Sequence, residues 1–183
     1  MTGPAGPGRW DRRCHAKVRT GFLPLLTGLL PFVRVSAKAD YAVRAAAELA
    51  AAEEGPIKGE RLAEAQDIPL QFLEHILLEL KHVGIVRARR GAKGGYWLAR
   101  PADDVTVADV IRAVEGPIAN VQSAPPESIE YRGNAEHLQD VWIAVRANLR
   151  AVLEQVTLAD LVSGDLPPVV EHLTGSPDAW APR

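Results

Sequence analysis

The 183-residue chain has a single cysteine, Cys14, and no long apolar run. One thiol excludes a disulfide within the chain, and it excludes a zinc or iron–sulfur site built mainly from cysteines. The longest apolar stretch, at residues 22–33, has about a dozen residues and is too short to span a bilayer. These absences predict a cytoplasmic protein that carries no membrane segment.

The sequence also lacks the common enzyme motifs. It contains no G-x-S-x-G elbow, no P-loop and no G-x-G-x-x-G fingerprint. The glycine-rich residues 91–95 follow a basic segment, which favours a hairpin tip over a phosphate cradle. None of the histidines at positions 75, 82, 137 and 172 has metal-site spacing with a carboxylate partner. We therefore predict no catalytic residue, no metal and no cofactor.

Charge is distributed unevenly along the chain. Residues 56–100 hold eight basic and five acidic side chains, whereas residues 101–183 hold five basic and thirteen acidic ones. An asymmetry of this kind predicts a basic working face and an acidic remainder.

Helical periodicity begins at Ser36, which is suited to cap a first helix that ends before Gly55. A short second helix follows over residues 58–66, and the sequence DIP predicts a turn with Pro69 at the first position of a third helix. One stripe of that third helix is apolar and is expected to face the core: Phe72, Leu73, Ile76, Leu77, Leu80 and Val83. The opposite face presents Gln71, Glu74, His75, Leu78 and Lys81.

The pattern then changes to two short strands around a glycine-containing loop, over residues 85–100. This hairpin carries five basic side chains and no acid. Two helices joined by a tight turn and followed by a basic hairpin predict a winged helix-turn-helix, in which one helix enters the DNA major groove and the hairpin approaches phosphates or the minor groove. A solvated surface hairpin is the alternative. The order of the elements favours DNA.

Residues 103–116 predict a helix that begins with a capping box formed by Thr106 and Asp109. A loop over 117–133 separates it from a long helix over 134–156, and residues 157–164 form a further short helix. An irregular tail covers 165–183. The long helix has a heptad seam of Leu138, Trp142, Val145, Leu149, Val152 and Val156. The seam predicts a dimer contact, and an intramolecular buried helix is the alternative.

Three segments in order match one family. The sequences "SAKADYAVRAAAELA", "LAEAQDIPLQFLEHILLELKHVGIVRARRGAKGGYWLARP" and "TVADVIRAVEGP" resemble the IscR/BadM-type transcriptional regulators, the family that includes NsrR and CymR. The resemblance covers about residues 33–164. It implies a mainly α fold with a small β-hairpin wing, in which a winged helix-turn-helix DNA-binding domain over 33–116 is followed by a long dimerisation helix. It also implies a homodimer that binds a palindromic operator on double-stranded DNA.

The resemblance also implies which residues contact DNA. Lys38 and Tyr41 of the first helix would lie near the DNA backbone, and Arg90 is the expected minor-groove residue. The other implied contacts come from the recognition helix and the wing: Gln71, Phe72, Glu74, His75, Arg89, Gly91, Lys93, Gly94, Gly95 and Tyr96.

The chain departs from many relatives in one respect. Those relatives hold an iron–sulfur cluster through three cysteines between the fourth helix and the dimer helix, and residues 118–137 here contain none. We therefore expect a cysteine-less member that works without a cluster. The effector stays open between a small molecule and a regulatory protein such as a metabolic enzyme. The latter case makes the chain a docking module as much as a repressor.

The N-terminal residues resemble a secretory signal peptide, with basic residues, an apolar run and the small-residue sequence VSA. However, Pro24 and Pro31 interrupt the run, and cleavage after VSA would remove the Ser36 cap. Family members typically begin with Met where this chain has Val33, and valine is the literal translation of a GTG start codon. We expect residues 1–32 to be a disordered extension that arises from translated upstream DNA.

Overall fold

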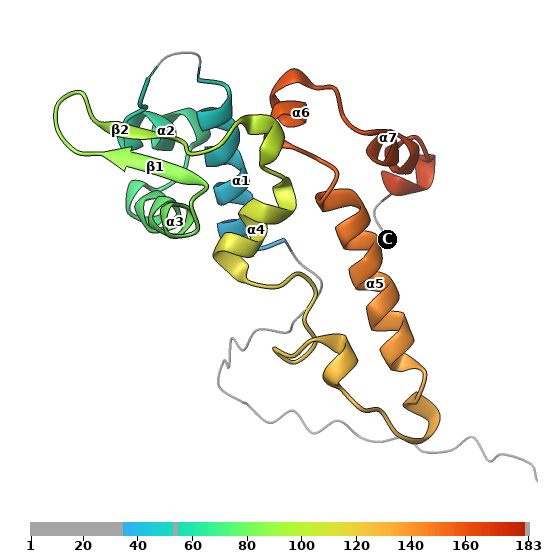
Figure 1. Cartoon of the computed structure of the whole chain (residues 1–183). Helices are drawn as coiled ribbons and strands as arrows, with labels where there is room; N and C mark the ends of the chain where they lie inside the picture. Colours follow the sequence, from blue (N-terminus) through green and yellow to red (C-terminus); the bar gives the residue numbers. More distant parts are fainter. Residues whose placement is uncertain (1–34, 53–54, 182–183) are drawn as a thin grey trace, which may run out of the picture. The chain divides into compact units, whose positions relative to one another are not determined.

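The computed structural model describes residues 35–52 and 55–181, which Figure 1 draws in colour. The predictions about residues 1–32 lie outside the described residues. Within the described part, no helix combines the length and the apolar character needed to cross a membrane. The architecture is mainly helical with one two-stranded hairpin, as the sequence predicts.

Helix α1 (Ala37–Ala50) packs against α2, α3, α4 and α6. Ser36 caps it, because its hydroxyl accepts a hydrogen bond from the Ala39 N–H at 3.0 Å. The buried face of α1 is made largely of alanine, so neighbouring helices approach its backbone closely: Ala39, Ala42, Ala45, Ala46 and Leu49.

Helices α2 (Gly59–Gln66) and α3 (Leu70–His82) form the helix-turn-helix. Asp67 in the turn has φ of 50°, and Ile68 is buried beside it. Pro69 is the N-cap of α3 rather than its first helical residue. The core face of α3 consists of Leu73, Ile76, Leu77 and Leu80, all of them fully buried.

Two residues of the predicted apolar stripe do not belong to the core, and that part of the prediction is wrong. Phe72 is 41% exposed and Val83 is 55% exposed. Val83 lies just beyond the helix as its C-cap, so the helical period no longer controls its direction. Phe72 lies against the ring of Tyr41 at the edge of the core.

The hairpin consists of β1 (Val86–Arg89) and β2 (Gly95–Leu98), which pair antiparallel with Val86 opposite Leu98 and Arg89 opposite Gly95. Ile57 forms an isolated bridge to Tyr96, so β2 is flanked on both sides. A short 3-10 turn (Ala102–Asp104) leads into α4 (Val107–Glu115). The predicted capping box of Thr106 and Asp109 is confirmed there.

The connection from α4 to α5 contains two 3-10 turns, Pro126–Ser128 and Gly133–Ala135. Helix α5 (Leu138–Leu153) is shorter than the predicted 134–156. At its start, Gly133 has φ of 63° and residues 133–135 form a 3-10 turn instead of a helical one. At its end, the chain straightens so that Val156 accepts a backbone hydrogen bond from Val107 at 2.9 Å.

The heptad spacing predicts Val156 on the α5 seam, and that placement is wrong. It follows the helix and is only 6% exposed. Helix α6 (Leu158–Ser163) begins with a capping box of Thr157 and Asp160, next to the α4 box across a Thr106–Thr157 bridge. The predicted irregular tail instead contains α7 (Pro168–Thr174) and a 3-10 turn (Pro177–Ala179), because a proline suits the first turn of a helix.

Candidate nucleic-acid interface

The exposed face of α3 and the wing border one groove. It has a volume of about 310 Å³ and is lined by Glu74, Leu78, Lys81, Ala88, Arg89, Arg90, Gly95 and Tyr96. Five of the residues expected to contact DNA therefore lie together, namely Glu74, Arg89, Arg90, Gly95 and Tyr96. Gln71 and His75 are exposed on the same helix as Glu74, one turn or less away. A groove with a helix on one side and guanidinium groups on the other is suited to a duplex with an anionic backbone.

The tip of the wing is held in one shape by its own backbone. The Gly94 N–H donates to the Gly91 carbonyl at 2.9 Å. A Cβ on Gly94 would overlap the Arg89 carbonyl oxygen, and one on Gly95 would overlap the Ile57 carbonyl oxygen. These glycines are therefore required by close backbone approach, which agrees with their predicted role in shaping the wing.

Two cationic side chains donate hydrogen bonds to backbone carbonyls of the same tip. The ammonium group of Lys58, just before α2, donates to the Gly91 carbonyl at 3.2 Å, and the guanidinium of Arg89 donates to the Lys93 carbonyl at 2.9 Å. Arg90 and Lys93 are exposed beside them. Lys58 is absent from the sequence-predicted site, because no local pattern relates it to a carbonyl 33 residues away.

The start of α3 is anchored to α1 through an aromatic pair. The rings of Tyr41 and Phe72 meet edge to face with centroids 5.8 Å apart, and the Arg44 guanidinium lies 5.3 Å from the centre of the Tyr41 ring. Arg44 also donates to the Gln66 carbonyl at the end of α2. The network connects both helices of the helix-turn-helix to α1, which sets the direction in which α3 projects.

Lys38 lies outside the groove and makes three contacts of its own. Its ammonium group is 2.8 Å from one carboxylate oxygen of Glu79 on α3, 3.0 Å from the other, and 2.7 Å from the Val114 carbonyl near the end of α4. A lysine that satisfies a carbonyl at a helix end is stabilised by the helix dipole. Lys38 thus joins α1, α3 and α4, and its expected contact with the DNA backbone stays a prediction.

Helix α5 buries none of its residues in the single chain. The seam side chains Leu138, Trp142, Val145, Leu149 and Val152 are half-buried, and Val141 is 51% exposed. The indole N–H of Trp142 is shielded from solvent yet has no hydrogen-bond partner among the described residues. An apolar helix left uncovered in this way needs a further surface to pack against.

The loop that precedes α5 is tied to it by side chains. The Gln139 amide lies 3.0 Å from the Ile129 carbonyl and 3.3 Å from those of Pro126 and Glu127. Arg146 pairs with the Glu127 carboxylate at 2.6 Å. A hydrogen bond from the Glu127 backbone and then the Arg146 guanidinium lower the pKa of Glu127. Polar side chains of α5 thus bind this loop.

The end of α5 is joined to α4 by an ion-pair network. Arg112 on α4 contacts Glu154 directly, and Arg150 lies 2.9 Å from the same carboxylate. The hydrogen bonds from Arg112 and then from Arg150 lower the pKa of Glu154. Across residues 35–52 and 55–181, no cluster of three histidine, cysteine, aspartate or glutamate side chains is placed to hold a metal ion.

The fold and the groove define a winged helix-turn-helix protein that binds DNA and regulates transcription. A family model described as "Rrf2: Iron-dependent Transcriptional regulator" matches residues 35–164, and the chain belongs to the Rrf2 family. The predicted resemblance to IscR- and CymR-type regulators, and the prediction of a regulator rather than an enzyme, are confirmed.

The match to this chain spans most of the length of several relatives. The putative HTH-type transcriptional regulator Rv1287 of Mycobacterium tuberculosis is 48% identical over 142 residues, which is 77% of this chain and 88% of the relative. CymR of Bacillus subtilis is 33% identical over 132 residues, or 72% of this chain and 91% of that one.

Solved structures agree with this assignment. The structure of CymR (YrzC), the global cysteine regulator of B. subtilis, has a TM-score of 0.61 at 33% identity, and the match covers 72% of this chain and 97% of that one. IscR of T. potens has a TM-score of 0.59 at 34% identity, with 72% and 88% covered. The expected fold class, mainly α with a hairpin wing, is confirmed.

Proposed function

We propose that the chain is a cytoplasmic repressor that binds a palindromic operator as a homodimer and does so without an iron–sulfur cluster. The observation that carries the proposal is the groove that Glu74 of α3 and Arg90 of the wing line together. A carboxylate on a recognition helix accepts hydrogen bonds from cytosine N4, and an arginine near a wing tip suits a narrow minor groove. The winged helix-turn-helix of one chain, formed by α1 to α4 and the wing, is called the head. One head therefore has the means to contact both grooves of a half-site.

The dimer is supported by α5. Trp142 and Leu149 lie on an apolar seam that the single chain leaves half-exposed, and a second copy of α5 would cover it. Two heads related by a two-fold axis bind half-sites that repeat with inverted symmetry. The seam consists of Leu138, Trp142, Val145, Leu149 and Val152, without Val156.

Operation without a cluster is supported by composition and by the loop before α5. Cys14 is the only cysteine of the chain, and it is far from residues 118–137 in sequence. Gln139 and Arg146 supply the loop with polar contacts that need no metal. DNA binding is therefore expected to be the same in air, under reducing anaerobic conditions and after treatment with a chelator.

The test uses the full chain purified from its host. Duplexes selected from random sequence are expected to contain an inverted repeat, and analytical ultracentrifugation is expected to give a dimer that binds one such duplex. Trp142→Glu places a charge on the seam and is expected to yield monomers with much weaker binding, while Ala147→Glu, at an exposed position of the same helix away from the seam, serves as the control. Selection of no sequence, or a dimer unaffected by W142E, would contradict the proposal.

Control by a protein partner is a second candidate. Its support is a group of exposed apolar side chains in the acidic C-terminal part, namely Val162, Leu173 and Trp180. Under this hypothesis a partner covers these residues and alters DNA affinity. Affinity purification at native expression would then recover a stoichiometric partner that a Leu173→Ser and Trp180→Ser variant loses. An intact operator response without such a partner would remove this candidate.

A further inference from the structure

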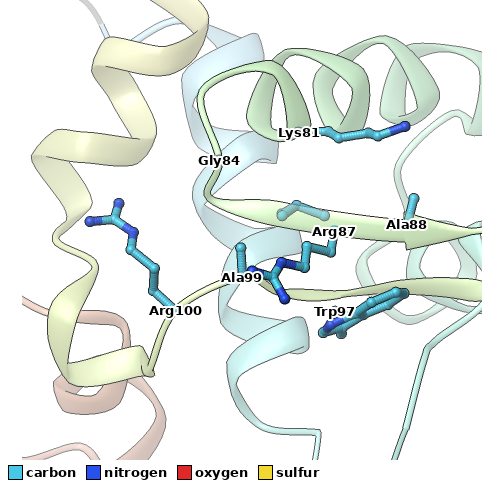
Figure 2. A pocket seen from close by; sticks show the side chains of 8 residues that line it. Lys81, Gly84, Arg87, Ala88, Trp97, Ala99 and Arg100 are labelled. Atoms are coloured by element: carbon cyan, nitrogen blue, oxygen red, sulfur yellow. The ribbon is translucent and has the colours of Figure 1, made fainter.

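A second hollow lies at the base of the wing, beside the DNA-facing groove. It has a volume of about 460 Å³, and Figure 2 shows seven of its residues by name. Arg87 and Trp97, which are opposite one another in the register of the hairpin, extend on the same side of it. Lys81 extends from α3 on the other side of β1, and Arg100 follows β2. Small residues complete the lining: Gly84, Val86, Ala88 and Ala99.

The cations of this hollow have no counter-charge. Among the residues that the structure describes, neither an ion pair nor a hydrogen bond engages the side chains of Lys81, Arg87 or Arg100, and no acid lines the hollow. Four other arginines, namely Arg44, Arg112, Arg146 and Arg150, each contact a carboxylate, whereas the remaining described arginines do not. Unpaired cations around a surface of small residues favour an extended anionic partner that approaches closely.

The hollow adjoins the groove assigned to DNA, because Lys81 and Ala88 line both of them. The four residues of β1 span roughly 13 Å, which equals the rise of about four phosphates at about 3.4 Å each along one DNA strand. This adjacency favours DNA over an acidic peptide as the occupant.

We propose that the base of the wing binds the phosphate backbone of DNA outside the half-site, with Arg87 and Arg100 as the contacting cations and Trp97 packed against the sugar edge. The inference rests on the proposed function, because the groove must first hold the operator. It extends the footprint of each head beyond the bases that α3 and the wing tip read. The added contact is independent of sequence.

The experiment compares two duplexes by fluorescence anisotropy between 50 and 200 mM salt. The core duplex ends at the outer edges of the two selected half-sites, and the extended duplex carries one more helical turn, about 10 base pairs, of mixed sequence on each side. The wild-type protein is expected to bind the extended duplex more tightly and with a steeper dependence on salt. Each phosphate contact contributes about 0.9 to the slope of log K against log salt, or about a 3.5-fold change in affinity over this range.

Arg87→Gln combined with Arg100→Gln is expected to remove this advantage while binding of the core duplex stays unchanged. Arg87→Lys with Arg100→Lys keeps the charges and is expected to retain the steeper slope. Arg132→Gln, which removes one exposed charge from the loop before α5, is the control for net charge, and circular dichroism checks that each variant folds.

The outcomes separate this inference from the proposed function. Equal binding of both duplexes by the wild type, or full retention of the extended-duplex advantage in R87Q/R100Q, overturns the inference alone. Binding of neither duplex by the wild type overturns the proposed function and the inference with it. Loss of affinity for a poly-glutamate peptide in R87Q/R100Q, with DNA binding unchanged, also overturns the inference and assigns the hollow to an acidic protein partner.

Discussion

The ring of Tyr41 in α1 packs edge to face against the ring of Phe72 at the start of α3, with an angle of 85° between the ring planes. Because α3 carries the exposed face that borders the groove, this pair connects the stability of the head to the direction of the recognition helix. Arg44, which lies over the Tyr41 ring and also donates to the Gln66 carbonyl, extends the connection to α2.

Phe72→Leu is expected to lower the free energy of unfolding by about 0.5–1.5 kcal/mol, since it keeps an apolar side chain but removes the ring pair. Urea denaturation measures the change. Tyr41→Phe keeps both rings and is the matched control, with stability near that of the wild type. A double-mutant cycle with Tyr41→Leu that shows no coupling would mean that the ring contact contributes nothing.

Gly94→Ala is expected to distort the wing, because a Cβ there would overlap the Arg89 carbonyl oxygen. Overpacking of this kind costs about 1–3 kcal/mol, and operator affinity should fall with it. Gly164→Ala is the comparison, since a Cβ at that position meets no atom within 4 Å. It carries the strain of a φ of 82° without a clash, so it should reduce stability modestly and leave operator affinity unchanged. Equal affinity losses in the two variants would contradict the argument.

Lys58→Met is expected to loosen the wing tip by removing the donor to the Gly91 carbonyl. One hydrogen bond contributes about 1 kcal/mol, so operator affinity should fall about fivefold. Lys58→Arg keeps a donor and should restore most of it. The salt dependence is diagnostic: a positioning role leaves the slope of log K against log salt unchanged, whereas a direct phosphate contact would lower it by about 0.9.

Glu154→Gln is expected to change how stability depends on acid. Hydrogen bonds from Arg112 and then Arg150 hold the pKa of Glu154 below its ordinary value of 4.5. The stabilisation from this carboxylate is therefore present above pH 4.5 and is lost as the pH falls through the lower, folded-state pKa. Thermal unfolding is measured from pH 7 down to pH 3, about 4 pH units. Over this range E154Q should lose less stability than the wild type as the pH falls. Parallel curves for the two proteins would show that the network does not stabilise the fold.

Local signals in the sequence were enough for the elements of the head. The Ser36 cap and the box of Thr106 and Asp109 involve residues three positions apart, so their geometry follows from the backbone they begin. The hairpin and Gly94 also follow from neighbouring residues, because its strands are four residues long and joined by a short loop, whereas Gly95 is required by the carbonyl of the distant Ile57.

Contacts between distant segments could not be predicted in this way. Lys58 reaches a carbonyl 33 residues away, and Lys38 reaches Glu79 across 41 residues. The heptad spacing alone extended α5 to Val156, whereas the backbone bond from Val107 to Val156 ends that regularity three residues earlier. In each case a residue distant in the sequence determines the local structure. A helical period of 3.5 or a strand period of 2 carries no information about such a partner.

The junction between α4 and α6 has a consequence for the operator. Val107 donates to the Val156 carbonyl, and Leu158 donates to the Val105 carbonyl, each at 2.9 Å, while Arg112 contacts Glu154. These two backbone hydrogen bonds and the ion pair thus join the head to the end of α5 without a flexible linker. In a dimer built on α5, the helix fixes the distance and the relative orientation of the two heads. One base pair inserted at the centre of the operator rotates one half-site by about a tenth of a helical turn relative to the other. A rigid dimer cannot adjust to this rotation, so one head is misaligned with its half-site.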